Sequence, residues 1–378
     1  MKAELNTLDQ LGYLSRGRSR NRPRDAAHLY GGPYPFIQTG DVKHAGLYIT
    51  SYGQTYSEAG LAQSKLWNAG TLCITIAANI ADTAILEFDA CFPDSVIGFV
   101  PDEQRADARF IKYVFDALLQ KRYQKFTQGA AQENLSQEKL LSLQFPVPSI
   151  EVQHQIADVL ATYDAHIENN RRRIQLLEQS ARLLYKEWFV HLRFPGHEHV
   201  KVADGVPKGW ARLPLGEILT LQRGFDLPTQ YRVEGHVPIY AATGINGYHN
   251  KAKVKGPGIV TGRSGSLGTV KYVLEDFWPL NTTLWVKEFK RVDAPFAYHL
   301  LASLRLEQYN GGVAVPTLNR NDVHRIEVVC PVASVIREFS EQVGVIYDQI
   351  DKLKCLSEKL REARDLLLPR LMSGEIEV

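Results

Sequence analysis

The sequence repeats itself once, and this internal repeat constrains the fold more than any other feature. At an offset of 183 residues, residues 129–135 align with residues 312–318, and Pro148 aligns with Pro331. The identities are few, but they keep their order over two lengths of about 180 residues. Further aligned pairs are Gly70 with Gly256 and Thr83 with Thr269 at an offset of 186, and Ile167 with Ile350 and Leu177 with Leu360 at 183. The chain is therefore an imperfect tandem duplication.

Each half begins with short apolar runs that are separated by glycine and proline, a pattern typical of β-strands. A helix with apolar residues at helical spacing follows in each half, over residues 108–120 and 294–307. The predicted strands include residues 72–74, 84–86 and 96–100 in the first half, and residues 259–260, 270–273 and 284–286 in the second.

Each half then ends in a long helix whose apolar positions alternate steps of four and three residues. This spacing is the seam of a heptad repeat. The first seam consists of Ile156, Leu160, Tyr163, Ile167, Asn170, Ile174, Leu177, Ala181, Leu184 and Trp188. The second consists of Phe339, Val343, Ile346, Ile350, Leu353, Ser357 and Leu360. We expect Pro369 and Gly374 to close the second helix.

Two such helices in one chain can pair with each other in antiparallel fashion. Asn170 is the kind of polar seam residue that fixes the register of a pair. The alternative is that each helix pairs with another chain. We expect four segments: a β-rich domain over residues 1–150, a long helix over 151–200, a second β-rich domain over 201–333 and a C-terminal helix over 334–378.

Composition places the chain among ordinary folded proteins, with 44% apolar and 23% charged residues among 378. The net charge of +2 does not exclude a nucleic-acid partner, because the local distribution of charge decides binding. The four cysteines are scattered, which argues against a zinc ribbon or a disulfide framework and favours buried free thiols. No apolar stretch is long enough to cross a membrane, and no signal peptide is recognisable. We therefore expect a cytoplasmic protein.

No catalytic motif is recognisable in the sequence. It contains no phosphate-binding loop for ATP and no glycine-rich strand-to-helix turn for a dinucleotide or S-adenosylmethionine. The glycine-rich stretch 262–268 leads into a predicted strand rather than a helix. The sequence offers no metal site. We expect this chain to have no active site and no cofactor of its own.

The sequence does contain candidates for contact with nucleic acid. Arginines at every second position from Arg16 to Arg24 form a basic loop suited to phosphate contacts. Arginine can bind guanine through two hydrogen bonds, and asparagine can bind adenine in the same way. For each residue, a purely structural role remains the alternative. The candidates are Arg16, Arg18, Arg20, Arg22, Lys121, Arg122, Lys125, Arg223, Asn246, Tyr248, Arg263, Ser264, Ser266 and Asn319. His249 could stack on a base, and residues 171–173 could contact DNA or form a solvated face.

Several strings resemble a known family, the specificity subunits of Type I restriction–modification enzymes. Residues 34–42 look like the opening of that family's target recognition domain, and residues 207–218 look like the start of a second one. Residues 316–319 and 368–376 are similar to the family's domain end and C-terminal tail. The resemblance extends over essentially the whole chain, although residues 8–14 match the family's usual opening only loosely.

The resemblance implies an α+β fold in which two β-rich target recognition domains are joined by two long helices that pair as an intramolecular antiparallel coiled coil. Each domain would read one half of a split target in double-stranded DNA, and the helices would set the spacer. The implied partners are two methyltransferase subunits and a motor-nuclease subunit, which would supply the sites for S-adenosylmethionine, ATP and Mg²⁺. The alternatives are a coiled-coil adaptor that does not read DNA, or a self-contained methyltransferase or endonuclease.

Overall fold

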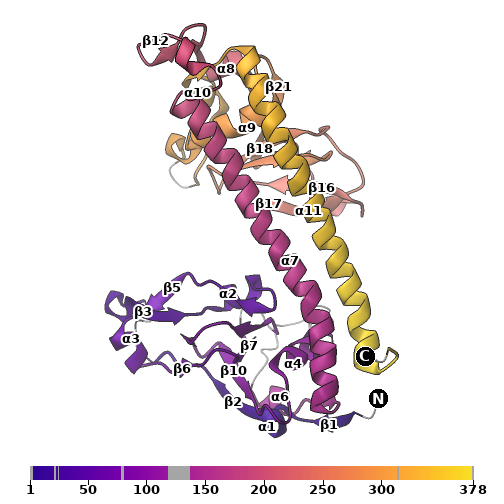
Figure 1. Cartoon of the computed structure of the whole chain (residues 1–378). Coiled ribbons are helices and arrows are strands. Elements are labelled where there is room, and N and C mark those ends of the chain that lie inside the picture. The colour runs from indigo at the N-terminus through magenta and orange to yellow at the C-terminus, as the bar shows by residue number, and fades with distance from the viewer. Residues whose placement is uncertain are drawn as a thin grey trace. The chain divides into compact units, whose positions relative to one another are not determined.

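The chain divides into two compact units by the contacts among its residues (Figure 1). Unit 1 comprises Met1–Arg172 and Leu353–Val378, and unit 2 comprises Arg173–Lys352. The computed structural model describes residues 3–20, 23, 25–77, 81–117, 137–312 and 315–376. Each unit thus holds one β-rich part together with a stretch of both long helices. The four segment boundaries expected from the sequence stay a prediction.

The β-rich part of unit 1 contains two larger sheets and the two-stranded pair β1-β11. A five-stranded sheet has the order β2-β10-β7-β8-β4, and a four-stranded sheet has the order β5-β3-β9-β6. The strands are β1 (Glu4–Asn6), β2 (Gly12–Arg16), β3 (Tyr30–Phe36), β4 (Tyr48–Ile49), β5 (Gln54–Tyr56), β6 (Leu66–Trp67), β7 (Leu72–Thr75), β8 (Thr83–Leu86), β9 (Ala90–Cys91), β10 (Val96–Pro101) and β11 (Phe145–Val147). The short helices are α1 (Leu8–Leu11), α2 (Thr39–His44), α3 (Glu58–Ala62), α4 (Ala108–Phe115) and α6 (Gln137–Leu141).

The β-rich part of unit 2 contains a four-stranded sheet, β15-β21-β18-β19, and a three-stranded sheet, β17-β16-β20. The strands are β12 (Val202–Ala203), β13 (Val206–Pro207), β14 (Ala211–Pro214), β15 (Leu219–Arg223), β16 (Val237–Ala241), β17 (Gly244–His249), β18 (Gly258–Gly262), β19 (Val270–Val273), β20 (Trp278–Pro279), β21 (Thr283–Phe289) and β22 (Glu327–Cys330). The helices are α8 (Leu215–Ile218), α9 (Ala294–Ser303) and α10 (Arg320–His324). The strands predicted at residues 72–74, 84–86, 96–100, 259–260, 270–273 and 284–286 are present.

The two units repeat the same strand pairings. β1 pairs with β11 as β14 pairs with β22, and β2 pairs with β10 as β15 pairs with β21. The parallel pair of β3 with β9 corresponds to the parallel pair of β16 with β20. α1 precedes β2 as α8 precedes β15. The segment from β1 to β2 is thus built like the segment from β14 to β15, although residues 8–14 and 215–221 differ in sequence.

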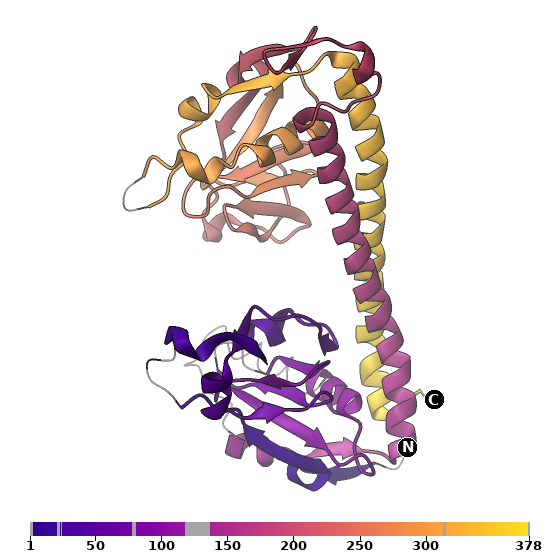
Figure 2. The same ribbon diagram turned by 60° about the vertical axis from the view of Figure 1, so that its left-hand side comes forward.

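The long helices are α7 (Ile150–Tyr185) and α11 (Ala333–Ser373), and a π-helical turn, Lys186–Val190, extends α7. In each unit their segments lie side by side and run in opposite directions (Figures 1 and 2). In unit 1, Asn170 donates a hydrogen bond to the Ser357 hydroxyl over 3.3 Å. In unit 2, the rings of Tyr185 and Phe339 are 5.9 Å apart. The long helices therefore form an intramolecular antiparallel pair.

The residues of the predicted seam are buried or half-buried. The buried ones are Ile156, Leu160, Asn170, Ala181, Trp188, Phe339, Val343, Ile350, Leu353 and Ser357, and the half-buried ones are Tyr163, Ile167, Ile174, Leu177, Leu184, Ile346 and Leu360. In unit 1 the helices share a core with α4 and β7, and in unit 2 they share a core with α9 and β21. Each helix thus packs on a β-rich part and on the other helix.

Three details differ from the sequence-based expectations. α11 continues through Pro369 to Ser373, because the one hydrogen bond that the proline cannot donate affects only the last turn, and the left-handed Gly374 (φ +73°) closes the helix. α9 ends at Ser303 rather than at residue 307, since Arg305 takes a left-handed conformation with φ at +48°. Cys355 is exposed rather than buried, because its position lies off the seam.

Among the residues that the structure describes, no helix is long and apolar enough to cross a lipid bilayer.

Candidate nucleic-acid interface

The basic loop of unit 1 begins where β2 ends. Its backbone is held in place by hydrogen bonds, because Ser64 donates to the Arg18 carbonyl over 2.7 Å and the Arg20 amide donates to Gln63 over 2.6 Å. The side chains of Arg16, Arg18 and Arg20 are exposed. An ordered backbone with exposed guanidinium groups is suited to phosphate contacts. Arg22 lies outside the described residues.

Directly after β2 and after β15, each unit requires a glycine, because the neighbouring backbone leaves no room for a side chain. A Cβ atom on Gly17 would clash with the carbonyl oxygen of Phe92, and one on Gly224 would clash with the carbonyl oxygen of Leu280. The amide of Gly17 donates to Val96, and the amide of Gly224 donates to Thr283 over 3.0 Å. The Arg-Gly strings that end the two strands therefore occupy equivalent positions in the fold.

Three of the candidates in unit 2 come together around one open hollow of about 520 Å³. Arg223, Arg263 and Asn319 line it together with Thr317 and Arg320. They come from three places, namely the end of β15, the end of β18 and the start of α10. The hollow is therefore formed by the tertiary fold and not by one loop. Arg320 was missed by sequence reasoning, although it directly follows Asn319.

The arginine and asparagine side chains at this hollow already have contacts within the protein. Arg263 donates to the Asn281 carbonyl over 3.2 Å, and Arg223 lies 3.8 Å from the Asp226 carboxylate. The side-chain oxygen of Asn319 caps α10 by accepting from the Asn321 amide over 3.0 Å. Because the side-chain oxygen of Asn319 is used in the cap, its NH₂ group is the part that can donate a hydrogen bond to an acceptor outside the protein.

The other candidates of unit 2 lie on β17 and in the turn after β18. Asn246, Tyr248 and Ser266 are exposed, and Ser264 is half-buried. The backbone of this turn is tied to residues 316 and 317, through the hydrogen bond of the Gly265 amide and the bridge of Ser264. His249 is buried and its ring accepts from the Val233 amide over 3.0 Å, so the expectation that it stacks on a base is wrong.

Two further basic clusters were candidates. Lys121, Arg122 and Lys125 lie outside the described residues. Arg171 and Arg172 are exposed on α7, and both bind the Glu168 carboxylate, at 2.7 Å and 3.0 Å. These ion pairs partly neutralise the cluster and support the solvated-face interpretation.

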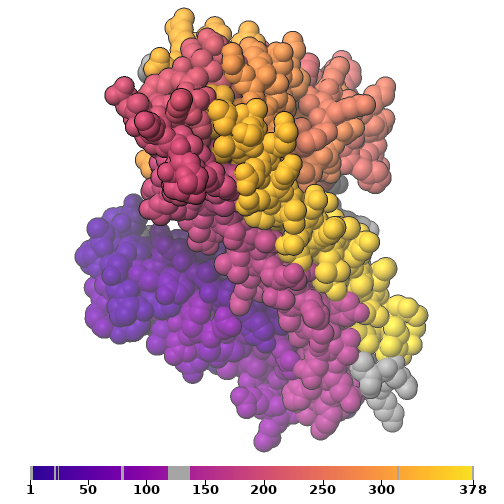
Figure 3. All heavy atoms as spheres, turned by 45° about the horizontal axis from the view of Figure 1, so that its top comes forward, coloured from indigo at the N-terminus to yellow at the C-terminus, as the bar shows by residue number. Residues whose placement is uncertain are grey.

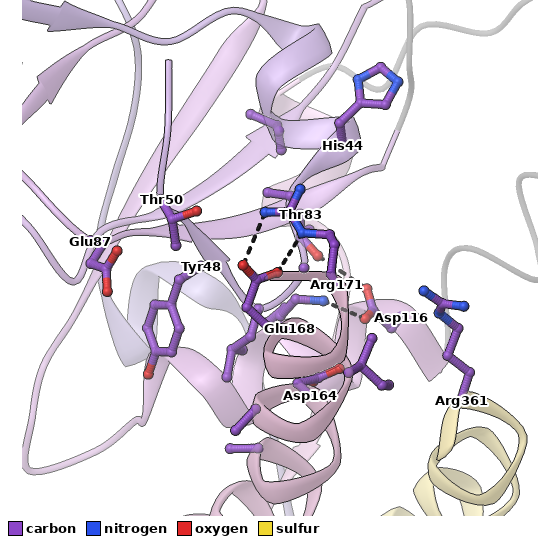
Figure 4. A pocket seen from close by; sticks show the side chains of 18 of the residues that line it. His44, Tyr48, Thr50, Thr83, Glu87, Asp116, Asp164, Glu168, Arg171 and Arg361 are labelled. Carbon is purple, nitrogen blue, oxygen red and sulfur yellow. Dashed lines mark hydrogen bonds and ion pairs between the residues drawn. The ribbon is translucent and has the colours of Figure 1, made fainter. Parts of the chain in front are cut away.

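The arginines of α7 border a pocket of about 620 Å³ in unit 1, which Figure 4 shows from close by. Three of its carboxylates form ion pairs inside the protein. Asp116 binds Lys112 at 2.6 Å, Glu168 binds Arg171, and Asp164 binds Arg364. Burial raises the pKa of Asp82 at its edge. Because the charges are largely matched, the pocket has the chemistry of a structural network rather than of a catalytic site.

Within residues 3–20, 23, 25–77, 81–117, 137–312 and 315–376, no group of three or more His, Cys, Asp or Glu side chains could hold a metal ion.

Known proteins resemble the chain along nearly its whole length. The family model for the Type I restriction modification DNA specificity domain matches residues 4–179 and 207–359. The Type I restriction enzyme MjaIX specificity subunit of Methanocaldococcus jannaschii is 24% identical, over 92% of this chain and 88% of that protein. The HindI specificity subunit of Haemophilus influenzae is 23% identical, over 62% and 69%.

A solved structure shares the fold. The crystal structure of the S subunit of a Type-I restriction-modification system from M. genitalium has a TM-score of 0.56 at 18% identity, over 97% of this chain and 95% of that one. The family model matches both halves of the repeat and most of the chain. The chain therefore belongs to the family of Type I restriction–modification DNA specificity subunits.

Proposed function

We propose that this chain is the DNA-reading, non-catalytic subunit of a Type I complex, in which each β-rich part reads one half of a bipartite target in double-stranded DNA. The observation that carries this proposal is one fold built twice with different side chains at matching places. At the equivalent Arg-Gly turns, for example, unit 1 continues with the exposed Arg18 and unit 2 with the half-buried Phe225. Different side chains at matching places would select different bases, so the two half-targets are expected to differ.

The basic loop of unit 1 and the hollow of unit 2 are the proposed contact regions. Arg16, Arg18 and Arg20 present three exposed cations in unit 1, while Arg223, Arg263 and Arg320 surround the hollow in unit 2. Phosphate contacts by such residues provide affinity, and contacts to base edges provide specificity. Asn246, Tyr248, Ser264, Ser266 and Asn319 remain proposed contacts of the second kind.

The long helices are proposed to set the spacer between half-targets and to bind the partner subunits. Figure 3 shows both helices at the surface of the molecule. Leu176 and Leu183, seven residues apart on α7, are 62% and 54% exposed. Exposed leucines at heptad spacing favour packing against helices of another protein. The proposed partners are two methyltransferase subunits and a motor-nuclease subunit, in the cytoplasm, and these supply the catalysis.

The test is to co-express the chain with its methyltransferase subunit and to map methylated adenines by long-read sequencing. We expect one bipartite, asymmetric motif. The variant R16A/R18A/R20A is expected to weaken methylation through unit 1, and R223A/R263A through unit 2. A stable complex that methylates no defined motif would contradict the proposal and would favour an adaptor.

A further inference from the structure

Three charged or polar side chains meet where the β-rich part of unit 1 packs on the long helices. The Tyr113 hydroxyl of α4 donates to one oxygen of Asp164 on α7 over 2.6 Å. The other oxygen of Asp164 accepts from Arg364 on α11. The side chains of Asp164 and Arg364 are only 6% and 22% exposed. Asp164 therefore links α4, α7 and α11 through one buried carboxylate.

The internal repeat identifies the counterpart of this junction in unit 2. At an offset of 186 residues, Asp107, which caps α4, aligns with Asp293, which caps α9. The same offset aligns Tyr113 with His299. The offset of 183 that aligns the long helices places Asp164 on Tyr347 and Ala181 on Arg364.

The counterpart in unit 2 is a junction of the same geometry that lacks the ion pair. The Tyr347 hydroxyl and the His299 ring nitrogen are 2.7 Å apart and buried. The Tyr185 ring stacks on His299 at 5.4 Å. Ala181, the counterpart of Arg364, is fully buried in the same core. The two junctions thus share a place in the fold, but only unit 1 has opposite charges on the two helices.

A second polar contact between the helices shows the same asymmetry. Asn170 and Ser357 are buried and bonded to each other in unit 1. Their repeat counterparts are Leu353 and Ile174, both apolar. The polar partners are therefore divided between the helices, with Asp164 and Asn170 on α7 and Arg364 and Ser357 on α11.

This division has a consequence for pairing between two copies of the chain. Because α7 and α11 are repeat counterparts, two α7 helices could pair in the register that α7 and α11 use. Asp164 of one copy would then face Ala181 of the other, and Asn170 would face Ile174. Two buried polar groups would lack their partners in each copy, and an unpaired buried charge is strongly destabilising. A pair of α11 helices would leave Arg364 and Ser357 without their partners in the same way.

We propose that the Asp164–Arg364 pair, supported by the Asn170–Ser357 hydrogen bond, selects α11 as the partner of α7 and disfavours pairing of like helices from two copies of the chain. The selecting element is confined to unit 1. Tyr113 makes it part of the domain packing, since the carboxylate that selects α11 also holds α4.

The test uses full-length chains with mismatched charges. One chain carries R364D and therefore has two carboxylates at the junction, and a second chain carries D164R and has two guanidinium groups. Within either chain the two helices repel each other, whereas α7 of each chain matches α11 of the other. When the chains are co-expressed with different tags, we expect tandem purification to recover at least tenfold more mixed dimer than from two wild-type chains.

Two controls separate selection from misfolding. The double variant D164R/R364D restores opposite charges within one chain and is expected to be monomeric, with a melting temperature closer to wild type than either single variant. As a second control, one chain carries E187R and the other carries R193E, which gives like charges at an exposed ion pair within each chain. These chains are expected to give no more mixed dimer than wild type. The proposal is overturned if the mismatched chains do not combine, or if the double variant is no more stable than the single ones.

Discussion

Units 1 and 2 share one topology but attach their β-rich parts to the long helices with different chemistry. Unit 1 uses the carboxylate of Asp164 between Tyr113 and Arg364, whereas unit 2 uses Tyr347 and His299 within an aromatic cluster around Phe339. The comparison shows that the shared fold determines where the β-rich part meets the helices, whereas the side chains that meet there can differ. A junction needs only matched partners, because a buried polar group is tolerated when it is hydrogen-bonded.

The largest expected difference between the units comes from removing one partner at each junction. Asp164→Ala leaves the Arg364 guanidinium with only the exposed carboxylate of Asp365, so we expect unit 1 to lose about 3 kcal/mol of unfolding free energy, the lower end for a broken buried ion pair. Tyr347→Phe removes one neutral hydrogen bond, so we expect unit 2 to lose about 1 kcal/mol. Hydrogen exchange of the α4 and α9 amides measures the two units separately. Equal losses would show that the charge in unit 1 does not matter.

The glycines at the Arg-Gly turns provide a comparison in which the units should behave alike. Gly17→Ala and Gly224→Ala each force a methyl group against a backbone carbonyl, so we expect each to lose about 1–3 kcal/mol. Gly46→Ala is the control, because no atom lies within 4 Å of its added Cβ. Denaturant unfolding measures all three. A loss at only one of the two turns would show that they are not equivalent.

Acid should weaken unit 2 through His299. Burial, with a contribution from Arg182, lowers the pKa of this histidine from 6.5 to about 3. Between these values the unfolded chain binds a proton that the folded chain does not. The stability from neutral His299 is therefore complete above pH 6.5 and is lost as the pH falls toward 3, by on the order of 1.4 kcal/mol per pH unit. The counterpart in unit 1, Tyr113, does not ionise in this range, because the ordinary pKa of tyrosine, 10.0, already lies far above it and burial raises the pKa of Tyr113 further.

The variant His299→Gln isolates this effect. We expect the stability difference between wild type and variant to shrink from pH 7 to pH 5, as measured by denaturant unfolding at each pH. A difference that stays constant over this range would mean that the histidine is not kept neutral by the fold.

The smallest effects are expected at the surface that we propose as the DNA contact. Arg18→Ala in unit 1 and Arg223→Ala in unit 2 each remove one exposed cation. If each contacts one phosphate, the slope of log affinity against log salt falls by about 0.9 in either variant. Fluorescence anisotropy of the assembled complex on its target measures this slope. Arg193→Ala serves as the control. If it lowered the salt slope by a similar amount, Arg18 and Arg223 would not be distinguished from other exposed arginines.

Much of the fold could be predicted from the sequence because its signals are local. The strands near residues 72, 84, 96, 259, 270 and 284 follow from short apolar runs, and the long helices follow from a heptad spacing. Pro369 misled the prediction of the end of α11, because the one hydrogen bond that it cannot donate affects only the last turn and does not end the helix. The basic loop of unit 1 was found because its arginines are close in sequence.

The candidate site was less predictable for a physical reason. Arg223, Arg263 and Asn319 were each proposed separately, and only the fold brings them to one hollow. Histidine is a residue type that can contact DNA, but the His249 ring is buried and accepts a hydrogen bond from the Val233 amide. Whether a polar side chain points to solvent or into a core depends on packing partners that are distant in the sequence.

The sequence by itself determined the duplication, the alternation of β-rich parts with heptad helices, and Asn170 as a polar seam residue. Only the tertiary structure decided which groups meet. Asp164 and Arg364 are 200 positions apart, and so their pairing leaves no local pattern. A periodic apolar spacing specifies that a helix has a buried face, but a buried charge is stable only beside the partner that the fold brings to it.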